Sequence, residues 1–184
     1  MEIRDADPQR DGAACAAIYA PHVESSAVSF EEVAPDATEM ATRIAATLAT
    51  HSWLVAERGG GVAGFAYSSR HRERAAYRWA ADVSVYVDSD SRRAGVGRAH
   101  YTELLSRLRT QGFQTACAGI TLPNAASLAL HESFGFEPVG VYRRIGWKAG
   151  AWRDVGWWQL ELAPPATEPP TELSAPAEPT ARLP

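Results

Sequence analysis

The chain has 184 residues, of which 46% are hydrophobic and 22% are charged, a composition typical of a globular domain with a buried core. Its formal net charge of −4 gives no net positive field, so neither nucleic acid nor an anionic membrane is an expected partner. The two cysteines, Cys15 and Cys117, have no metal-ligand spacing and predict free thiols in a reducing compartment. The N-terminal residues MEIRDADPQR lack the apolar segment of a signal peptide, so we expect a cytoplasmic protein without a metal centre.

The first half of the chain predicts alternating strands and helices. Residues 35–50 are expected to form a helix, because Asp36 and Glu39 have the spacing of a capping box and apolar side chains recur at helical intervals. RGGG at 58–61 separates two apolar runs and predicts the turn of a hairpin. In chain order we expect a strand at Glu2–Arg4, a helix from Pro8 to about Ala20, the 35–50 helix, and strands at Trp53–Glu57, Val62–Tyr67 and Ala81–Val87.

The second half predicts two more helices and three more strands. The helix after the loop SRRAGVGRAHY (91–101) has an apolar stripe and ends near Gly112, and Asn124 is expected to cap a shorter helix that ends near Gly135. Strands are expected at Phe113–Ile120, at about Pro138–Ile145 and at Val155–Leu162. The stripe consists of Tyr101, Leu104, Leu105 and Leu108. Strands interrupted by four helices, without an internal repeat, indicate an α+β domain.

The segment from Ala163 onward differs in composition from the rest of the chain. It holds seven of the twelve prolines and no aromatic residue. Such a segment cannot bury enough apolar surface to offset the entropy of ordering it. We therefore expect a domain at 1–162 and a disordered tail at 163–184.

The loop at 91–98 has the features of an anion site. It leaves a predicted strand and enters a helix whose first turn contains Gly95 and Gly97. The first N–H groups of a helix have no internal partner and lie at the positive end of its dipole, and glycine lets a bulky anion approach them closely. Three arginines add positive charge, namely Arg92, Arg93 and Arg98. The loop therefore predicts a phosphate site of pyrophosphate size.

Two other interpretations of the glycines remain. A dinucleotide fingerprint fits poorly, because its third glycine position is His100 and no acidic residue follows at the distance of a ribose. RGGGVAG at 58–64 matches the G-x-G-x-x-G string but opens a strand, so a nicotinamide oxidoreductase is the least favoured class. Glycines that only permit a turn are the plainer alternative for the loop taken alone.

The wider sequence resembles the GNAT superfamily in two separated motifs. Arg92-x-x-Gly95-x-Gly97 is similar to its acetyl-CoA pyrophosphate loop, and NAASLALHESFGF (124–136) to its second signature. The resemblance narrows to the phosphinothricin N-acetyltransferase family through SSAVSFEE (25–32), WLVAE (53–57), AYRWAADVSVYV (76–87), ITLPNAASLALHESFGF (120–136) and WRDVGWWQL (152–160). It implies the GNAT fold, a mixed splayed β-sheet flanked by about four helices, with acetyl-CoA as cosubstrate and a homodimer as the assembly. It also implies that acetyl-CoA contacts Val85, Tyr86, Val87, Arg92, Arg93, Ala94, Gly95, Val96, Gly97, Arg98 and Asn124.

The resemblance implies two catalytic residues. Acetyl transfer to an amine needs a base for the ammonium, a donor for the oxyanion and a proton for the leaving thiolate. Asp82 takes the position of the base, where the family normally has Glu, so the shorter side chain favours a bridging water. His131 takes the position of the acid, and a backbone N–H of Val85–Val87 is the expected oxyanion donor. The plainer alternatives are a hydrogen-bonded strand-edge Asp and a core His.

The substrate side is carried by SRHRERAAYRWA (69–80). Its arginines suit a carboxylate or phosphinate, although alternate arginines also suit a solvated face. Arg74 and Tyr77 match the family's Arg-x-x-Tyr, Phe30 is expected to line the same pocket, and Arg78 departs from the family pattern. The C-terminal tryptophans are expected at a dimer surface and a pocket wall.

We therefore predict an N-acetyltransferase that transfers an acetyl group from acetyl-CoA to the amino group of a small amino acid-like substrate. Phosphinothricin or methionine sulfoximine is the substrate type that the resemblance implies, with direct attack in a ternary complex. The alternatives are acetylation of another amine, such as a peptide N-terminus or other metabolite, and an acetyl-CoA-binding module without activity.

Overall fold

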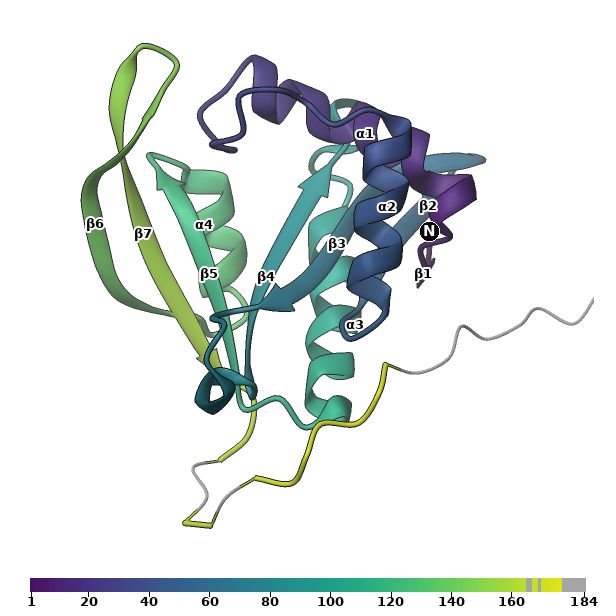
Figure 1. The fold of residues 1–184 in the computed structure, drawn as a ribbon. Helices are drawn as coiled ribbons and strands as arrows, with labels where there is room; N and C mark the ends of the chain where they lie inside the picture. Colours follow the sequence, from purple (N-terminus) through teal and green to yellow (C-terminus); the bar gives the residue numbers. More distant parts are fainter. Residues whose placement is uncertain (165–166, 169, 177–184) are drawn as a thin grey trace, which may run out of the picture.

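The computed structural model describes residues 1–164, 167–168 and 170–176 (Figure 1). Its elements are β1 (Glu2–Asp5), α1 (Pro8–Glu24), α2 (Ala37–Leu48), β2 (Trp53–Arg58), β3 (Gly61–Arg70), the 3-10 helix η1 (Ala75–Tyr77), β4 (Ala80–Val87), the 3-10 helix η2 (Ser89–Ser91), α3 (Val96–Gln111), β5 (Thr115–Leu122), α4 (Ala125–Glu132), β6 (Glu137–Lys148) and β7 (Ala151–Glu161). The predicted α+β class with four α-helices is confirmed.

The seven strands form one sheet in the order β1-β2-β3-β4-β5-β7-β6. Every neighbouring pair is antiparallel except β4 and β5, which are parallel. That parallel pair extends over three residue pairs and ends at Asp82↔Cys117, after which the two strands diverge (Figure 1). The sheet is therefore splayed, as the GNAT resemblance implies.

Helices cover both faces of the sheet. In Figure 1, α1 and α2 lie over one face of β2–β4, and α3 lies behind the other. The predicted apolar stripe of α3 is fully buried in the larger core cluster, together with Phe113 of the following turn. A second cluster fills the space between the sheet and the α1–α2 pair and includes Val23, Ile44 and Phe65. Burial of these side chains is the main favourable term that holds the layers together.

Helix ends follow the capping residues that the sequence contains. The Asp36 carboxylate accepts from the Glu39 N–H at 2.8 Å, which confirms the predicted N-terminus of α2. Gly112 ends α3 in the left-handed conformation (φ +96°). The next residue, Phe113, donates its N–H to the Leu108 carbonyl at 3.0 Å, so this N–H is not free for the sheet and β5 starts at Thr115 rather than at Phe113.

Other element ends also differ from the prediction. Helix α1 runs to Glu24, one turn beyond the expected end at Ala20, because burial of Val23 in the core stabilises this extra turn. Helix α4 ends at Glu132, because a turn closed by the N–H of Gly135 follows it. Strands β6 and β7 are longer than expected and pair up to Lys148↔Ala151 across the tight turn between them.

The described part of the C-terminal segment lies against the domain. Trp79 donates its indole N–H to the Thr171 carbonyl at 2.9 Å, and Arg78 pairs with Glu172 at 3.0 Å. Leu173 packs on the larger core cluster. Composition alone did not predict these contacts, and the remainder of the predicted tail, 165–166, 169 and 177–184, lies outside the described residues. Among the helices that the structure describes, none is long and apolar enough to cross a membrane.

Candidate active site

The predicted anion loop leads from β4 into α3. Gly95 precedes the helix with φ +79°, and a Cβ built there meets no atom within 4 Å, so the backbone conformation rather than packing requires glycine. Arg93 also has a positive φ of 61°. No side chain caps the start of α3, whereas the start of α2 is capped. The loop therefore presents helix N–H groups without a side-chain partner beside two exposed arginines, Arg92 and Arg93.

The rest of the loop is anchored to the protein. The Val96 side chain is buried, and a Cβ at Gly97 would lie 3.3 Å from the Leu130 side chain, so this glycine allows α3 and α4 to approach closely. Arg98 donates to the Ser133 hydroxyl at 3.1 Å and is directed toward the end of α4. Asn124 accepts the Ser127 N–H at 3.1 Å, which confirms its predicted capping role.

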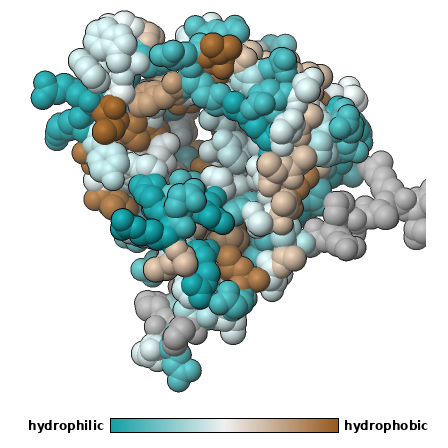
Figure 2. Space-filling view, viewed as in Figure 1, coloured by the Kyte–Doolittle hydropathy of each residue, from teal (hydrophilic) through white to brown (hydrophobic). Residues whose placement is uncertain are grey.

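Asp82 lies at the point where the sheet splits. It is the last residue of β4 that pairs with β5, so Val85–Val87 have β3 as a strand neighbour on one side and diverge from β5 on the other. In the space-filling view the surface is hollowed between these two halves of the molecule (Figure 2). The predicted base and the predicted oxyanion strand therefore border the same opening.

The Asp82 carboxylate has a partner that sequence reasoning missed. Its Oδ1 lies 2.6 Å from Nδ1 of His71, and the two side chains are 27% and 16% exposed. Burial raises the pKa of Asp82, against the opposing effects of the His71 hydrogen bond and the Arg72 charge. The β3–β4 register, with Ser69 opposite Asp82, brings the residues that follow β3 beside this carboxylate. The pairing register of β3 and β4 is therefore the signal that would have identified His71 as the partner of Asp82.

Aromatic and thiol groups surround this pair. The His71 ring lies edge-on to Trp157, with ring centroids 5.7 Å apart, and 6.0 Å from the Tyr77 ring. Arg72 lies 5.4 Å above the centre of the Trp157 ring. Ligand atoms of His71, Asp82 and Cys117 lie within 4.8 Å of one another. Two of these atoms are already joined by the hydrogen bond, and burial raises the pKa of the Cys117 thiol to about 11.

His131 occupies a different environment. Its side chain is buried, Nδ1 lies 2.8 Å from the Ser127 carbonyl and Nε2 lies 2.8 Å from the Tyr101 hydroxyl. The carbonyl can only accept, so Nδ1 carries the hydrogen and Nε2 accepts from the tyrosine. Burial lowers the pKa of His131, which favours the neutral ring. Both nitrogens are thus engaged inside the protein, an arrangement typical of a core histidine, and no hydrogen bond or ring contact joins it to Asp82 in the described part of the chain.

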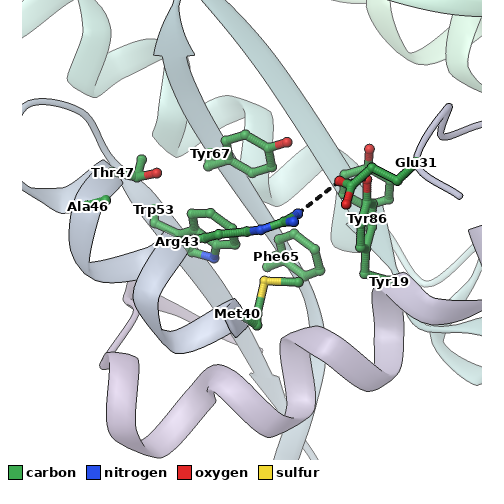
Figure 3. Close-up of a pocket in the computed structure, with 10 residues that line it drawn as sticks. All are labelled: Tyr19, Glu31, Met40, Arg43, Ala46, Thr47, Trp53, Phe65, Tyr67 and Tyr86. Carbon is green, nitrogen blue, oxygen red and sulfur yellow. Dashed lines mark hydrogen bonds and ion pairs between the residues drawn. The ribbon is translucent and has the colours of Figure 1, made fainter. Parts of the chain in front are cut away.

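A cavity of about 280 Å³ lies between α2 and the same face of the sheet that carries Asp82 (Figure 3). Its floor is a stack of aromatic rings, and at its rim Glu31 accepts from Arg43 and from the Tyr19 hydroxyl, both at 2.8 Å. Burial opposes ionisation of Glu31, yet these donors hold its pKa below the usual value. The lining residues of the floor are Trp53, Phe65, Tyr67 and Tyr86.

The predicted substrate residues fall in two places. Tyr77 lies in η1, half-exposed and beside His71, and Arg74 is exposed at the start of the same short helix. Phe30 lies apart from them on the α1–α2 loop, where its ring packs so closely on Gly146 of β6 that a Cβ there would be 2.2 Å away. Lys148 donates to the Glu31 carbonyl beside it. The α1–α2 loop thus contacts the β6–β7 hairpin across the splay.

Comparisons with known proteins agree with this geometry. The acetyltransferase (GNAT) domain model matches residues 5–157. The phosphinothricin N-acetyltransferase of Streptomyces viridochromogenes is 38% identical over 170 residues, which cover 92% of this chain and 92% of that protein. The L-methionine sulfoximine/L-methionine sulfone acetyltransferase of Salmonella typhimurium is 34% identical over 163 residues, covering 88% of this chain and 95% of that protein.

A solved structure gives the same result for the fold. The crystal structure of a GNAT superfamily phosphinothricin acetyltransferase from Sinorhizobium meliloti in complex with AcCoA matches with a TM-score of 0.88 at 34% identity, covering 93% of each chain. The splayed sheet, the glycine loop and the family match over most of the chain therefore lead to one conclusion: this protein belongs to the GNAT acetyltransferase family and is an N-acetyltransferase.

Proposed function

We propose that residues 1–162 form a catalytic domain that transfers the acetyl group of acetyl-CoA to the amino group of a small amino acid-like substrate, of the phosphinothricin or methionine sulfoximine type. The carrying observation is the position of Asp82, a half-buried carboxylate with a raised pKa at the point where β4 and β5 part. A thioester that enters the splay from the α3 side would meet an amine at this carboxylate.

The cosubstrate fits the loop and the strand that follow Asp82. Arg92, Arg93, Ala94 and the first N–H groups of α3 would hold the pyrophosphate. The Tyr86 side chain packs on Phe65, with ring centroids 5.2 Å apart, and is therefore turned into the protein. The backbone of Val85–Val87 would then bind the pantetheine amides and the thioester oxygen of the cosubstrate. Asn124 and Arg98 would close the far side of the site from α4 and α3.

The reaction is proposed as direct attack in a ternary complex. The ammonium loses a proton to the Asp82 site, directly or through a water, and the amine nitrogen attacks the carbonyl carbon. The C–S bond then breaks, and the second nitrogen proton is taken up by the thiolate. The resemblance gives the role of this proton donor to His131, whose two ring nitrogens contact the Tyr101 hydroxyl and the Ser127 carbonyl of α4.

Arginine and tyrosine side chains support an amino acid-like substrate. Arg74, which precedes η1, and Tyr77, at its end, would bind the substrate carboxylate at the entrance to the Asp82 site, and the aromatic cavity with Glu31 and Arg43 lies on the same face of the sheet. Phe30 would act indirectly, by holding the α1–α2 loop against Gly146. Two relatives named for phosphinothricin and methionine sulfoximine support this substrate class.

We also propose that the enzyme is a homodimer that works in the cytoplasm. Strand β6 is the edge of the sheet and exposes large apolar side chains (Figure 2). These residues are Val139, Val141, Tyr142, Ile145 and Trp147. An exposed apolar edge strand favours association with a second copy. Both cysteines are buried free thiols, which suits a reducing compartment.

The testing experiment is colorimetric thiol release from acetyl-CoA across phosphinothricin, methionine sulfoximine, common amino acids, a polyamine and a short peptide. Release with the first two substrates supports the proposal, and release only with the peptide or polyamine assigns a different amine. If acetyl-CoA raises the melting temperature but no amine is acetylated, the chain is a binding module, and the proposed activity is wrong.

A further inference from the structure

We propose that His71 is the group that takes the proton from the substrate ammonium, with Asp82 as the carboxylate that orients it. This inference rests on the proposed acetyl transfer and deepens it, because it assigns the base to a histidine–aspartate pair rather than to Asp82 alone.

The first argument is the hydrogen bond between the two side chains. An ionised carboxylate only accepts, so at 2.6 Å from Oδ1 the Nδ1 atom of His71 must carry the hydrogen. In the neutral ring the lone pair then lies on Nε2. The carboxylate thus selects the tautomer that leaves Nε2 able to accept a proton, which is the role of the orienting acid in histidine-based catalysis generally.

The second argument is what Nε2 contacts. Nε2 of His71 has no hydrogen-bond partner among the residues described, and it is not sealed within the protein, since the side chain is 16% exposed. His131 differs, because Tyr101 and the Ser127 carbonyl occupy both of its nitrogens. His71 is therefore the histidine of this site whose free nitrogen can reach a substrate.

The third argument is reach and basicity. Asp82 is one methylene shorter than the Glu that the family resemblance implies at this position, and an imidazole bonded to it extends the site by the width of a ring. Imidazole is also the side chain that most often serves as a general base in enzymes. The shorter acid and the histidine thus fit together as one unit.

The surroundings of His71 hold its ring in place and bring titratable and charged groups beside it. Trp157 and Tyr77 contact the ring edge-on, which limits its rotation. The titratable or charged groups that face it are the Asp82 carboxylate from β4, the Cys117 thiol from β5, the Arg72 guanidinium and the Tyr77 phenol.

The proton balance is complete without another reactant. Nε2 accepts one proton from the ammonium and releases it to solvent. The nitrogen attacks the thioester carbon, the C–S bond breaks, and the second nitrogen proton is transferred to the departing thiolate. The products are the amide, the thiol and one solvent proton.

The kinetic test compares His71→Gln with His71→Ala and with His51→Gln, a control histidine that lies beside Phe113 and has no contact with Asp82 among the residues described. We expect His71→Gln to lower kcat by about 10²–10⁴-fold with unchanged acetyl-CoA binding, and added imidazole to restore part of the activity of His71→Ala. The control should keep wild-type rates. His71 variants that retain activity within about threefold, beside an inactive Asp82→Asn, would assign the base to Asp82 alone and overturn the inference.

A spectroscopic test does not depend on finding the amine. Long-range ¹⁵N–¹H spectra, with the His71 signals assigned from their absence in His71→Gln, report the tautomer directly. We expect the Nδ1–H form in the wild type and its loss as the favoured form in Asp82→Ala. An Nε2–H tautomer in the wild type would overturn the inference even where acetyl transfer itself is confirmed.

Discussion

Replacing Asp82 by Asn should lower activity without lowering stability at pH 7. The substitution keeps the shape of the side chain but removes the charge that accepts the His71 hydrogen and supports proton uptake. A positioned acid–base group contributes about 10²–10⁴ in rate, so we expect a loss of roughly 3–5 kcal/mol of transition-state stabilisation. The variant should still bind acetyl-CoA, because Asp82 lies outside the loop at 91–98 that is proposed to hold the pyrophosphate.

The effect on stability follows from the pKa of Asp82, which burial raises in the folded state. An acid with a raised folded pKa binds its proton more tightly when folded, so its ionised form is a cost to stability above that pKa. The cost disappears as the pH falls through the folded pKa toward the unfolded value. Asp82→Asn should therefore melt no lower than the wild type at pH 7, and any difference in its favour should shrink toward pH 4.

Thiol release and thermal melts at pH 4, 5.5 and 7 would measure both effects. A variant that is inactive because it has unfolded, with a melting temperature well below that of the wild type at pH 7, would show that Asp82 is a structural residue. A variant with nearly wild-type turnover would contradict the acid–base role itself.

Three further predictions test other parts of the structure. Gly95→Ala forces a side chain into a left-handed conformation that costs about 1–2 kcal/mol, so acetyl-CoA affinity measured by calorimetry should fall about tenfold. Gly97→Ala, whose Cβ crowds Leu130, should instead lower the stability of the domain. Leu173→Ala removes a partly buried contact of the C-terminal segment and should lower the unfolding free energy by about 1 kcal/mol and the melting temperature by about 2–4 °C; no change would mean that the segment does not stabilise the domain. Trp147→Lys on the edge strand should shift sedimentation equilibrium toward monomer, and an unchanged mass would place any dimer interface elsewhere.

Much of the architecture follows from local signals in the sequence. Asp36 and Asn124 cap the helices they precede, and Gly112 ends α3, because each acts on backbone groups within a few residues of itself. The α3 stripe is buried as its spacing predicts. The glycine and arginine loop that leads into α3 could also be located from the sequence, since its residues adjoin the start of a single helix.

The tertiary structure decided the features that depend on residues distant in sequence. His71 meets Asp82 only because the β3–β4 register brings them together. In the linear sequence His71 stands among arginines, and nothing next to it indicates this partner. His131 is drawn into the core by Tyr101, thirty residues away, so its motif position alone could not reveal that both nitrogens are occupied. Side-chain chemistry and local caps are thus set by the sequence itself. Which groups share a proton depends on distances of about 3 Å, and these are fixed only when the strands have paired and the helices have packed.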